Sequence, residues 1–307
     1  MNNKIIIITG QTATSKTDLA IKLAQYYNTE IINADAVIFY KYMDIGGAKP
    51  NAKELSMVIH HLIGIKEPHE DFTANHFMLE ADKIIKKLHT QNKIPIVVGG
   101  SQLYIKALLR GFFKIPDTPQ GIKNKWRKLL KENGSKYLHQ ELEKVDPESA
   151  IRLHPNDSQR LERALEVFET TGKTITEFQK EHQFKDLRYN YIKLATFYER
   201  EELYARINKR VKIMVDMGLE QEVRSLLGMG YTPENTKIMK AIAYPEFTKY
   251  INKEWSLEEA ITKIQQHTRN FAKRQTTGLK SEPEVNWLNK ENNFNEAVKL
   301  IDSFLND

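Results

Sequence analysis

The residues best suited to chemistry lie between Gly10 and Thr17, in the segment GQTATSKT. This segment follows the apolar run KIIIIT and precedes a helical pattern, the place of a phosphate-binding loop of the form G-x-x-x-x-G-K-[ST]. In such a loop backbone N–H groups cradle phosphate oxygens, the lysine adds a positive charge and the hydroxyl binds Mg²⁺. Lys16 and Thr17 match the pattern, so the segment predicts a phosphate site.

Ser15 departs from this pattern, because it stands where the second glycine belongs. If the backbone needs a positive φ there, a side chain costs on the order of 1 kcal/mol and crowds the phosphates. The alternative is a merely polar helix start, with Thr14 or Ser15 as its cap. A lysine and a hydroxyl at the right spacing after a buried strand favour the phosphate loop.

Two other predicted strands also end in polar or glycine residues. Asp35 ends the run EIINAD, and Gly99, Gly100 and Ser101 follow the run IPIVV. Ligands of open α/β sheets bind beyond the carboxyl ends of the strands, so we expect all three strand ends at one crevice. Asp35 could bind Mg²⁺ through water or act as a general base there, or it could only cap the next turn. With the Ser101 hydroxyl, the set predicts a phosphate-handling site.

The spacing of apolar residues predicts strands at 4–9, 30–35 and 94–100, and helices at 15–27, 73–90 and 103–110. Continuous apolar runs are typical of strands buried on both faces. Strands that alternate with helices predict a parallel sheet with helices on its faces, an α/β fold like the core of P-loop NTPases. A further strand is expected at 191–198, with long amphipathic helices at 200–227 and 256–275.

The middle of the chain has a different character. Helical patterns without strands continue to about residue 182, so we expect a mostly helical insertion domain at 113–188 within a catalytic core of 1–112 and 189–307. Near Trp126 the insertion is rich in basic residues that could grip nucleic-acid phosphates, or could form only a solvated helix face. These residues are Lys114, Lys123, Lys125, Arg127 and Lys128.

The composition limits the class of protein. The chain has 307 residues, with 40% hydrophobic and 28% charged residues, values that argue against a disordered chain. Its 46 basic and 40 acidic residues leave a net charge of +6, which is compatible with nucleic acid. It has no apolar run near the roughly 20 residues of a membrane span, and no cysteine for disulfides or thiolate metal sites. With no signal-peptide pattern either, we expect a cytoplasmic protein.

Longer motifs cover almost the whole chain. On these motifs the sequence resembles the tRNA dimethylallyltransferases, which prenylate the adenine 3′ to the anticodon. The segment HPNDSQRLERALEV, within 153–173, is highly specific to that family. The other matching segments, besides the loop and EIINAD, are MDIGGAKP at 43–50, HHLIGI at 60–65, IPIVVGGSQLYIKALLRG at 94–111, LYARINKRVKIMVDMGLEQEV at 203–223 and TRNFAKRQ at 268–275.

The resemblance implies catalytic roles at the predicted crevice. The prenyl donor is dimethylallyl diphosphate, whose diphosphate lies on the loop with Mg²⁺ at Thr17. Asp35 is the general base for the adenine amine, and Ser101 takes the place of a family threonine. An arginine of one basic helix contacts the diphosphate, and the spacing leaves Arg206 and Arg210 both open. The loop residues concerned are Gly10, Thr12, Ala13, Thr14, Ser15, Lys16 and Thr17.

The resemblance also implies the tRNA anticodon stem-loop as a partner. The family's Q-R-x-x-R helix falls on Gln159, Arg160 and Arg163, although an exposed helix that pairs with Glu162 and Glu166 would explain the same residues. Since the chain has no cysteine, it is similar to bacterial, zinc-free members, and we expect a monomer that binds no membrane. The residues expected to contact tRNA are Asp35, Ala36, Val37, Ile38, Ser101, Lys123, Gln159, Arg160, Leu161, Glu162 and Arg163.

The chain departs from the family pattern mainly around the crevice. The family serine and glutamine that contact the substrate base are replaced by Ala36 and Ile38. Each lost hydrogen bond to a base costs about 1–3 kcal/mol of discrimination, so we predict a weakened or altered choice of substrate. The other departures are Ser15, Gln102 and Ala243 in place of glycine, Gly47 and Ser101 in place of threonine, Pro245 in place of lysine, Gly278 in place of tryptophan and Leu279 in place of phenylalanine.

Three other functions fit part of the sequence. A relative that prenylates free adenine nucleotides would not need the segment QRLER or the helical insertion. An RNA-binding protein without catalysis would not need Asp35 and Lys16. A small-molecule kinase would share the phosphate loop but not the motifs beyond it.

The departures can be tested by reversing them. We expect Ile38→Gln and Ser15→Gly each to raise the rate of prenyl transfer, because the first restores a polar contact to the base and the second removes a side chain from the loop. The measurement is the initial rate on an anticodon stem-loop, and no gain from either change would count against this explanation.

Overall fold

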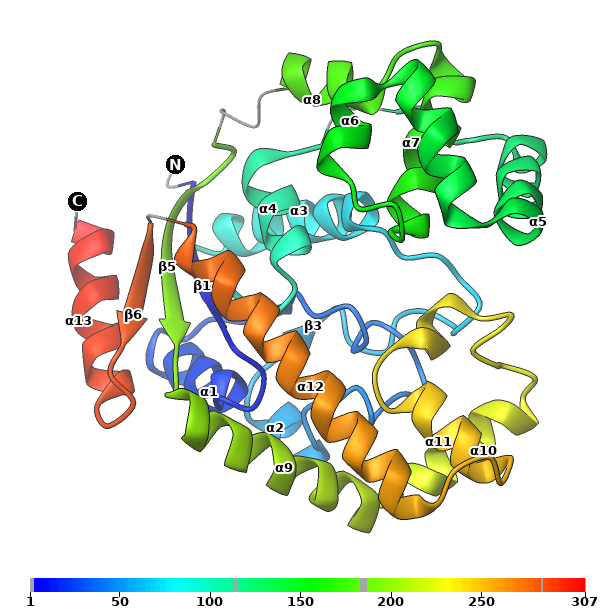
Figure 1. Ribbon diagram of the computed structural model, residues 1–307. Coiled ribbons are helices and arrows are strands. Elements are labelled where there is room, and N and C mark those ends of the chain that lie inside the picture. Colours follow the sequence, from blue (N-terminus) through cyan, green and yellow to red (C-terminus); the bar gives the residue numbers. More distant parts are fainter. Residues whose placement is uncertain (1–2, 113–114, 183–186, 283, 307) are drawn as a thin grey trace. The chain divides into compact units, whose positions relative to one another are not determined.

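The computed structural model describes residues 3–112, 115–182, 187–282 and 284–306 (Figure 1). The chain divides into two compact units. Unit 1 comprises Met1–Leu109 and Arg188–Asp307, and unit 2 comprises Arg110–Leu187. Lys114, one of the basic residues singled out in the sequence, lies outside the described residues.

Unit 1 is built on a six-stranded parallel sheet with the strand order β3-β2-β4-β1-β5-β6. The central strand β1 is buried along its whole length and pairs with β4 on one side and β5 on the other. This arrangement confirms the predicted α/β class. The strands are β1 (Lys4–Gly10), β2 (Ile31–Asn33), β3 (His60–His61), β4 (Ile96–Val98), β5 (Asn190–Thr196) and β6 (Val285–Leu288).

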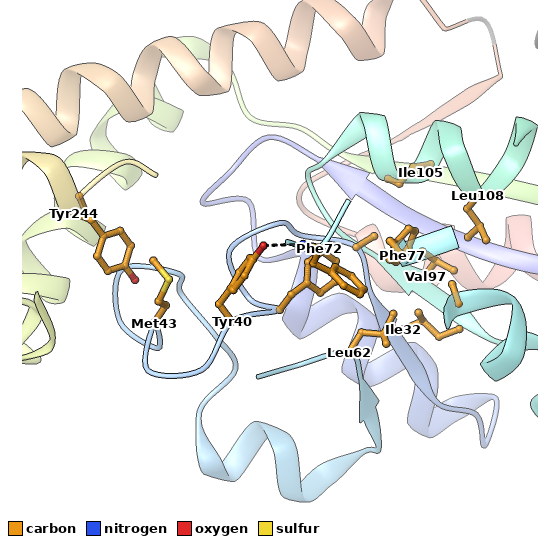
Figure 2. Packing of buried hydrophobic residues seen from close by; sticks show 14 of the residues in the cluster. Ile32, Tyr40, Met43, Leu62, Phe72, Phe77, Val97, Ile105, Leu108 and Tyr244 are labelled. Atoms are coloured by element: carbon orange, nitrogen blue, oxygen red, sulfur yellow. Dashed lines mark hydrogen bonds between the residues drawn. The ribbon is translucent and has the colours of Figure 1, made fainter. Parts of the chain in front are cut away.

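Side chains of β1 alternate between two hydrophobic cores, one on each face of the sheet. Ile5 and Ile7 join the larger core, which Figure 2 shows in part, whereas Ile6 and Ile8 join the other. Residues of α3 (Ala74–Thr90), α4 (Gln102–Arg110), α10 (Leu219–Gly228) and α11 (Tyr244–Ile251) cover the first face. Residues of α1 (Lys16–Tyr26) and α13 (Asn293–Asn306) cover the second.

The helix predicted at 200–227 is in fact two helices, so that prediction is wrong in one respect. α9 (Arg200–Asp216) ends just before Gly218, whose φ of 101° is a left-handed conformation that interrupts a helix, and α10 follows. α12 (Leu257–Lys280) runs a few residues past the predicted end. The remaining elements of unit 1 are α2 (Ala52–Met57) and the 3₁₀ helix η1 (Lys237–Lys240).

The described residues of unit 2 form four helices and no strand. Trp126, Leu138, Leu142 and Leu161 form its own hydrophobic core. Asp146 joins two of its helices, because it accepts hydrogen bonds from the Ser149 N–H and the Thr176 hydroxyl. The helices are α5 (Gln120–Val145), α6 (Pro147–Arg152), α7 (Ser158–Thr171) and α8 (Ile175–His182).

None of the described helices combines the length and the apolar character that a membrane crossing requires.

A carboxylate of α10 anchors the loop that follows β2. Glu222 Oε2 accepts hydrogen bonds from the backbone N–H groups of Asp44 at 2.8 Å and Ile45 at 2.7 Å. Glu222 Oε1 accepts from the Gly46 N–H at 2.9 Å and from the Tyr244 hydroxyl at 3.0 Å. A Cβ at Gly46 would lie 2.6 Å from the Tyr244 oxygen, so only glycine fits there. The loop is therefore fixed to α10 and α11, and Figure 2 shows Tyr244 beside Met43 of this loop.

We expect Glu222→Ala to lower the free energy of unfolding by about 3 kcal/mol or more, because it leaves three N–H groups and a buried hydroxyl without their charged acceptor. Glu222→Gln keeps one acceptor oxygen and is expected to cost roughly half as much. The matched control is Glu220→Ala, which removes only a partly exposed pair with Arg224 on the same helix and is expected to cost under about 0.5 kcal/mol. Urea unfolding measures all three, and equal losses for the two alanine variants would contradict the anchoring role.

Candidate active site

The predicted strand ends meet at one edge of the sheet. β1 ends at Gly10, and its neighbour β4 is followed by Gly99 and Gly100. Asp35 follows β2, which pairs with β4. The Ser101 hydroxyl accepts a hydrogen bond from the Ala36 N–H at 3.2 Å, which ties the β2 and β4 ends together. Parallel strands place their carboxyl ends on the same side, so these residues lie at one edge of the sheet, as predicted.

The segment after β1 adopts the irregular backbone of a phosphate loop. Ala13 and Ser15 have φ values of 63° and 58°, both in the left-handed region. Gly10 is required at its position, since a Cβ there would lie 2.3 Å from the Thr196 carbonyl oxygen. The buried Thr14 hydroxyl donates to the Gln11 carbonyl at 2.7 Å and lies 2.6 Å from the Thr196 hydroxyl. Backbone of this kind turns successive N–H groups toward a bound anion.

Lys16 begins helix α1 and supplies the positive charge expected of the loop. Its Nζ donates to the Gln11 carbonyl oxygen at 2.6 Å. Desolvation lowers the pKa of Lys16 to about 8, with the Arg210 charge acting in the same direction and the Asp35 carboxylate in the opposite one. Lys16, Asp35 and Arg210 therefore lie close enough to interact electrostatically.

Both arginines left open by the sequence lie at this site, one turn apart on α9. Arg206 Nε donates to the Ala13 carbonyl at 2.8 Å, so this side chain lies directly on the loop. Burial lowers the pKa of Arg210, which the nearby Asp35 carboxylate raises in part. Arg206 is thus the arginine at the phosphate loop, and Arg210 is the one beside the carboxylate.

Comparison with known proteins points to one family. A family model described as IPP transferase matches residues 38–282. A tRNA dimethylallyltransferase 1 from Citrifermentans bemidjiense is 44% identical over 302 residues, which are 98% of this chain and 97% of that protein. A tRNA dimethylallyltransferase from Geobacter sulfurreducens is 42% identical over 301 residues, 98% of this chain and 96% of its own length. The chain belongs to the IPP transferase family.

Solved structures agree with this assignment. The full-length tRNA isopentenylpyrophosphate transferase from Bacillus halodurans has a TM-score of 0.72 and 33% identity, over 99% of this chain and 96% of that one. A eukaryotic dimethylallyltransferase acting on tRNA has a TM-score of 0.85 and 28% identity, over 99% of this chain and 79% of its own. The resemblance seen in the sequence is confirmed, and so is the prediction that this IPP transferase family member is an enzyme.

Gln275 of α12, to which the motifs assign no role, joins the segments that follow β1 and β4. Its Oε1 accepts from the Thr12 N–H at 2.8 Å, and its Nε2 donates to the Gly100 carbonyl at 3.1 Å. A Cβ at Gly100 would lie 2.3 Å from that nitrogen, so the glycine makes room for the amide. Gln11 acts in the same way, since it accepts from the Tyr198 N–H at 3.0 Å and donates to the Thr276 hydroxyl at 2.9 Å. Both residues lie in segments singled out in the sequence, Gln11 in GQTATSKT and Gln275 in TRNFAKRQ, but neither pattern indicates these contacts.

The segment after Asp35 presents apolar side chains where the family pattern has polar ones. Ala36, Val37 and Ile38 are all partly buried, and the Ile38 carbonyl accepts from the Gly64 N–H at 2.9 Å. The backbone of this segment is therefore held in place, and what differs from the family pattern is the chemistry of its side chains.

Unit 2 carries the other residues expected to contact tRNA. Gln159, Arg160 and Arg163 are exposed on α7, whereas the side chain of Leu161 is fully buried in the core of this unit. Leu161 therefore supports the helix, and its side chain is not available to RNA. Lys123, on α5, is partly exposed.

Several charged groups of unit 2 already have partners within the unit. Arg163 Nη1 donates to the Thr118 hydroxyl at 2.9 Å and lies 3.5 Å from the Glu166 carboxylate. Arg160 lies 3.3 Å from the Asp157 carboxylate. The further ion pairs of the basic α5 segment are Lys125 with Glu169, Arg127 with Glu162, and Lys128 with Glu132.

Within the described residues, no group of three or more His, Cys, Asp or Glu side chains could hold a metal ion alone. Thr17 and Asp35, both partly exposed, provide a hydroxyl and a carboxylate at this edge of the sheet. Such sparse oxygen donors fit Mg²⁺, which usually binds through one or two protein oxygens, water and substrate phosphates.

Proposed function

We propose that this protein transfers a dimethylallyl group from dimethylallyl diphosphate to the exocyclic amine of the adenine 3′ to the anticodon in tRNA. The observation that carries the proposal is the pairing of a cationic phosphate loop with a carboxylate. Lys16 and Arg206 lie on the loop, and the charge of Asp35 acts on Lys16. Membership of the IPP transferase family supports the same reaction.

The proposed chemistry needs an anion site and a base. The amine nitrogen forms a bond to the first carbon of the dimethylallyl group, while the bond from that carbon to the diphosphate oxygen breaks and the oxygen keeps the electron pair. Asp35 takes the proton that the amine loses. Lys16, Arg206 and the loop N–H groups stabilise the negative charge that develops on the diphosphate.

Mg²⁺ would be held by the Thr17 hydroxyl together with diphosphate oxygens, and would neutralise part of the leaving-group charge. The target adenine must leave its stack to reach the crevice, which costs less in an anticodon loop than in a duplex.

We further propose that unit 2 is the insertion domain that contacts the anticodon stem-loop, through Gln159, Arg160, Arg163 and Lys123. Ala36 and Ile38 make the base-contacting segment apolar, which supports a weakened or altered choice of substrate. We also propose that the protein acts as a cytoplasmic monomer.

A product assay tests the function. The protein, Mg²⁺, dimethylallyl diphosphate and an anticodon stem-loop are incubated, and digested RNA is searched by mass spectrometry for isopentenyl-adenosine. We expect product from the wild type and a rate at least about 100-fold lower with Asp35→Asn, because the amide accepts no proton. The matched control is Asp71→Asn, an exposed carboxylate outside the crevice, which should leave the rate unchanged. A wild type that binds the stem-loop but forms no product would overturn the proposal.

The pKa of Lys16, about 8, predicts how binding depends on pH. Below pH 8 the ammonium is charged and attracts the diphosphate. Above pH 8 binding must also take up a proton, so the affinity for dimethylallyl diphosphate should fall by as much as about tenfold per pH unit. The terminal phosphate ionises near pH 6 and is not the cause.

Calorimetry without RNA measures this dependence. Lys16→Arg is the control, since a guanidinium stays charged and should flatten the profile between about pH 7 and about pH 9. An equal slope in the wild type and in Lys16→Arg would assign the titration to another group.

A further inference from the structure

Two atoms of the phosphate loop hold Arg206. The Ala13 carbonyl oxygen accepts from Arg206 Nε at 2.8 Å, and the Ser15 hydroxyl accepts from Nη2 at 3.0 Å. The guanidinium also lies over the ring of Tyr198, 4.4 Å from its centroid. Two hydrogen bonds from different nitrogens together with the ring contact restrict both the position and the orientation of the planar guanidinium.

Ser15 is an unexpected residue for its backbone conformation. Its φ of 58° and ψ of 34° lie in the left-handed region, which glycine adopts without strain and which the phosphate-loop pattern fills with glycine. The Ala13 carbonyl belongs to the backbone and would be present with any side chain. The Ser15 hydroxyl, in contrast, is a contact to Arg206 that exists only because serine replaces glycine in this chain.

We propose that Ser15 is a positioning residue, whose hydroxyl holds the Arg206 guanidinium beside the phosphate loop so that its other N–H groups are ready to bind the diphosphate. The inference rests on the proposed function in taking diphosphate as the ligand of the loop. It differs from the expectation drawn from the sequence, in which the serine side chain only hinders the loop.

The physical advantage is preorganisation. A free arginine side chain loses rotamer freedom when it binds an anion, and that loss weakens binding. A guanidinium already held by two hydrogen bonds and an aromatic ring has lost most of this freedom before the ligand arrives. The planar guanidinium still has N–H groups beyond the two engaged with the loop, and these can bind phosphate oxygens.

Two substitutions separate the hydroxyl from the backbone strain. Ser15→Ala removes the acceptor and keeps a side chain at positive φ. Ser15→Gly removes the acceptor and also relieves the strain, so its two effects oppose one another. We therefore expect Ser15→Ala to bind diphosphate more weakly than Ser15→Gly does.

The experiment is a double-mutant cycle on the full chain, with the affinity for inorganic diphosphate in Mg²⁺ measured by calorimetry. Ser15→Ala is expected to weaken binding about fivefold to tenfold in the wild-type background and not at all in the Arg206→Gln background, because the hydroxyl acts through that arginine. Circular dichroism checks that each variant is folded. If Ser15→Ala does not fold, Ser15→Gly takes its place in the cycle.

Either of two results would overturn the proposal: wild-type affinity in Ser15→Ala, or the same loss in both backgrounds. Prenyl transfer to the stem-loop is measured in parallel. A wild type that transfers no prenyl group contradicts the proposed function, while the diphosphate cycle still decides the role of Ser15.

Discussion

The site depends on one constraint, the irregular backbone between β1 and α1. Two residues there, Ala13 and Ser15, hold left-handed conformations that L-amino acids adopt at a cost. Buried polar side chains offset that cost: Thr14 binds within the loop and to β5, and Gln275 binds the Thr12 N–H from α12. The sheet, α9 and α12 thus meet at this loop because each supplies a contact that its backbone needs.

The charges around the loop explain why it suits an anion. Desolvation is the main cause of the lowered pKa of Lys16; the Asp35 carboxylate opposes it, and the Arg210 charge adds to it to a smaller extent. Desolvation also lowers the pKa of Arg210. Arg206 adds a third positive charge beside the loop. A ligand with several negative charges stabilises these desolvated cations, and a neutral ligand does not. The same arrangement keeps a carboxylate near the anion site, where a base for a reacting amine is required.

Local patterns in the sequence were sufficient for the central strands, the phosphate loop and Asp35, because an apolar run, a glycine and a lysine at fixed spacing determine the structure of their own segment. They were insufficient for β3, which is two residues long, and for the break at Gly218, where a helical pattern continues on both sides. Gln275 was missed for another reason. Its partner Thr12 lies 263 residues away, and an amide on a helix has the pattern of a surface residue until the fold buries it.

The departures from the family pattern are of two kinds. Gln102 Nε2 donates to the Gln275 carbonyl at 2.7 Å, and a Cβ at Gly278 would lie 2.0 Å from Gln102 Oε1. A tryptophan at 278 is therefore incompatible with this placement of Gln102, so the two changes compensate one another. Ser15 likewise gains a partner in Arg206. Ala36 and Ile38 gain no side-chain hydrogen bond, since their side chains are apolar. The changes at positions 15, 102 and 278 thus preserve the framework around the loop, whereas Ala36 and Ile38 change the polarity of the segment after Asp35, to which the proposed change in substrate choice is assigned.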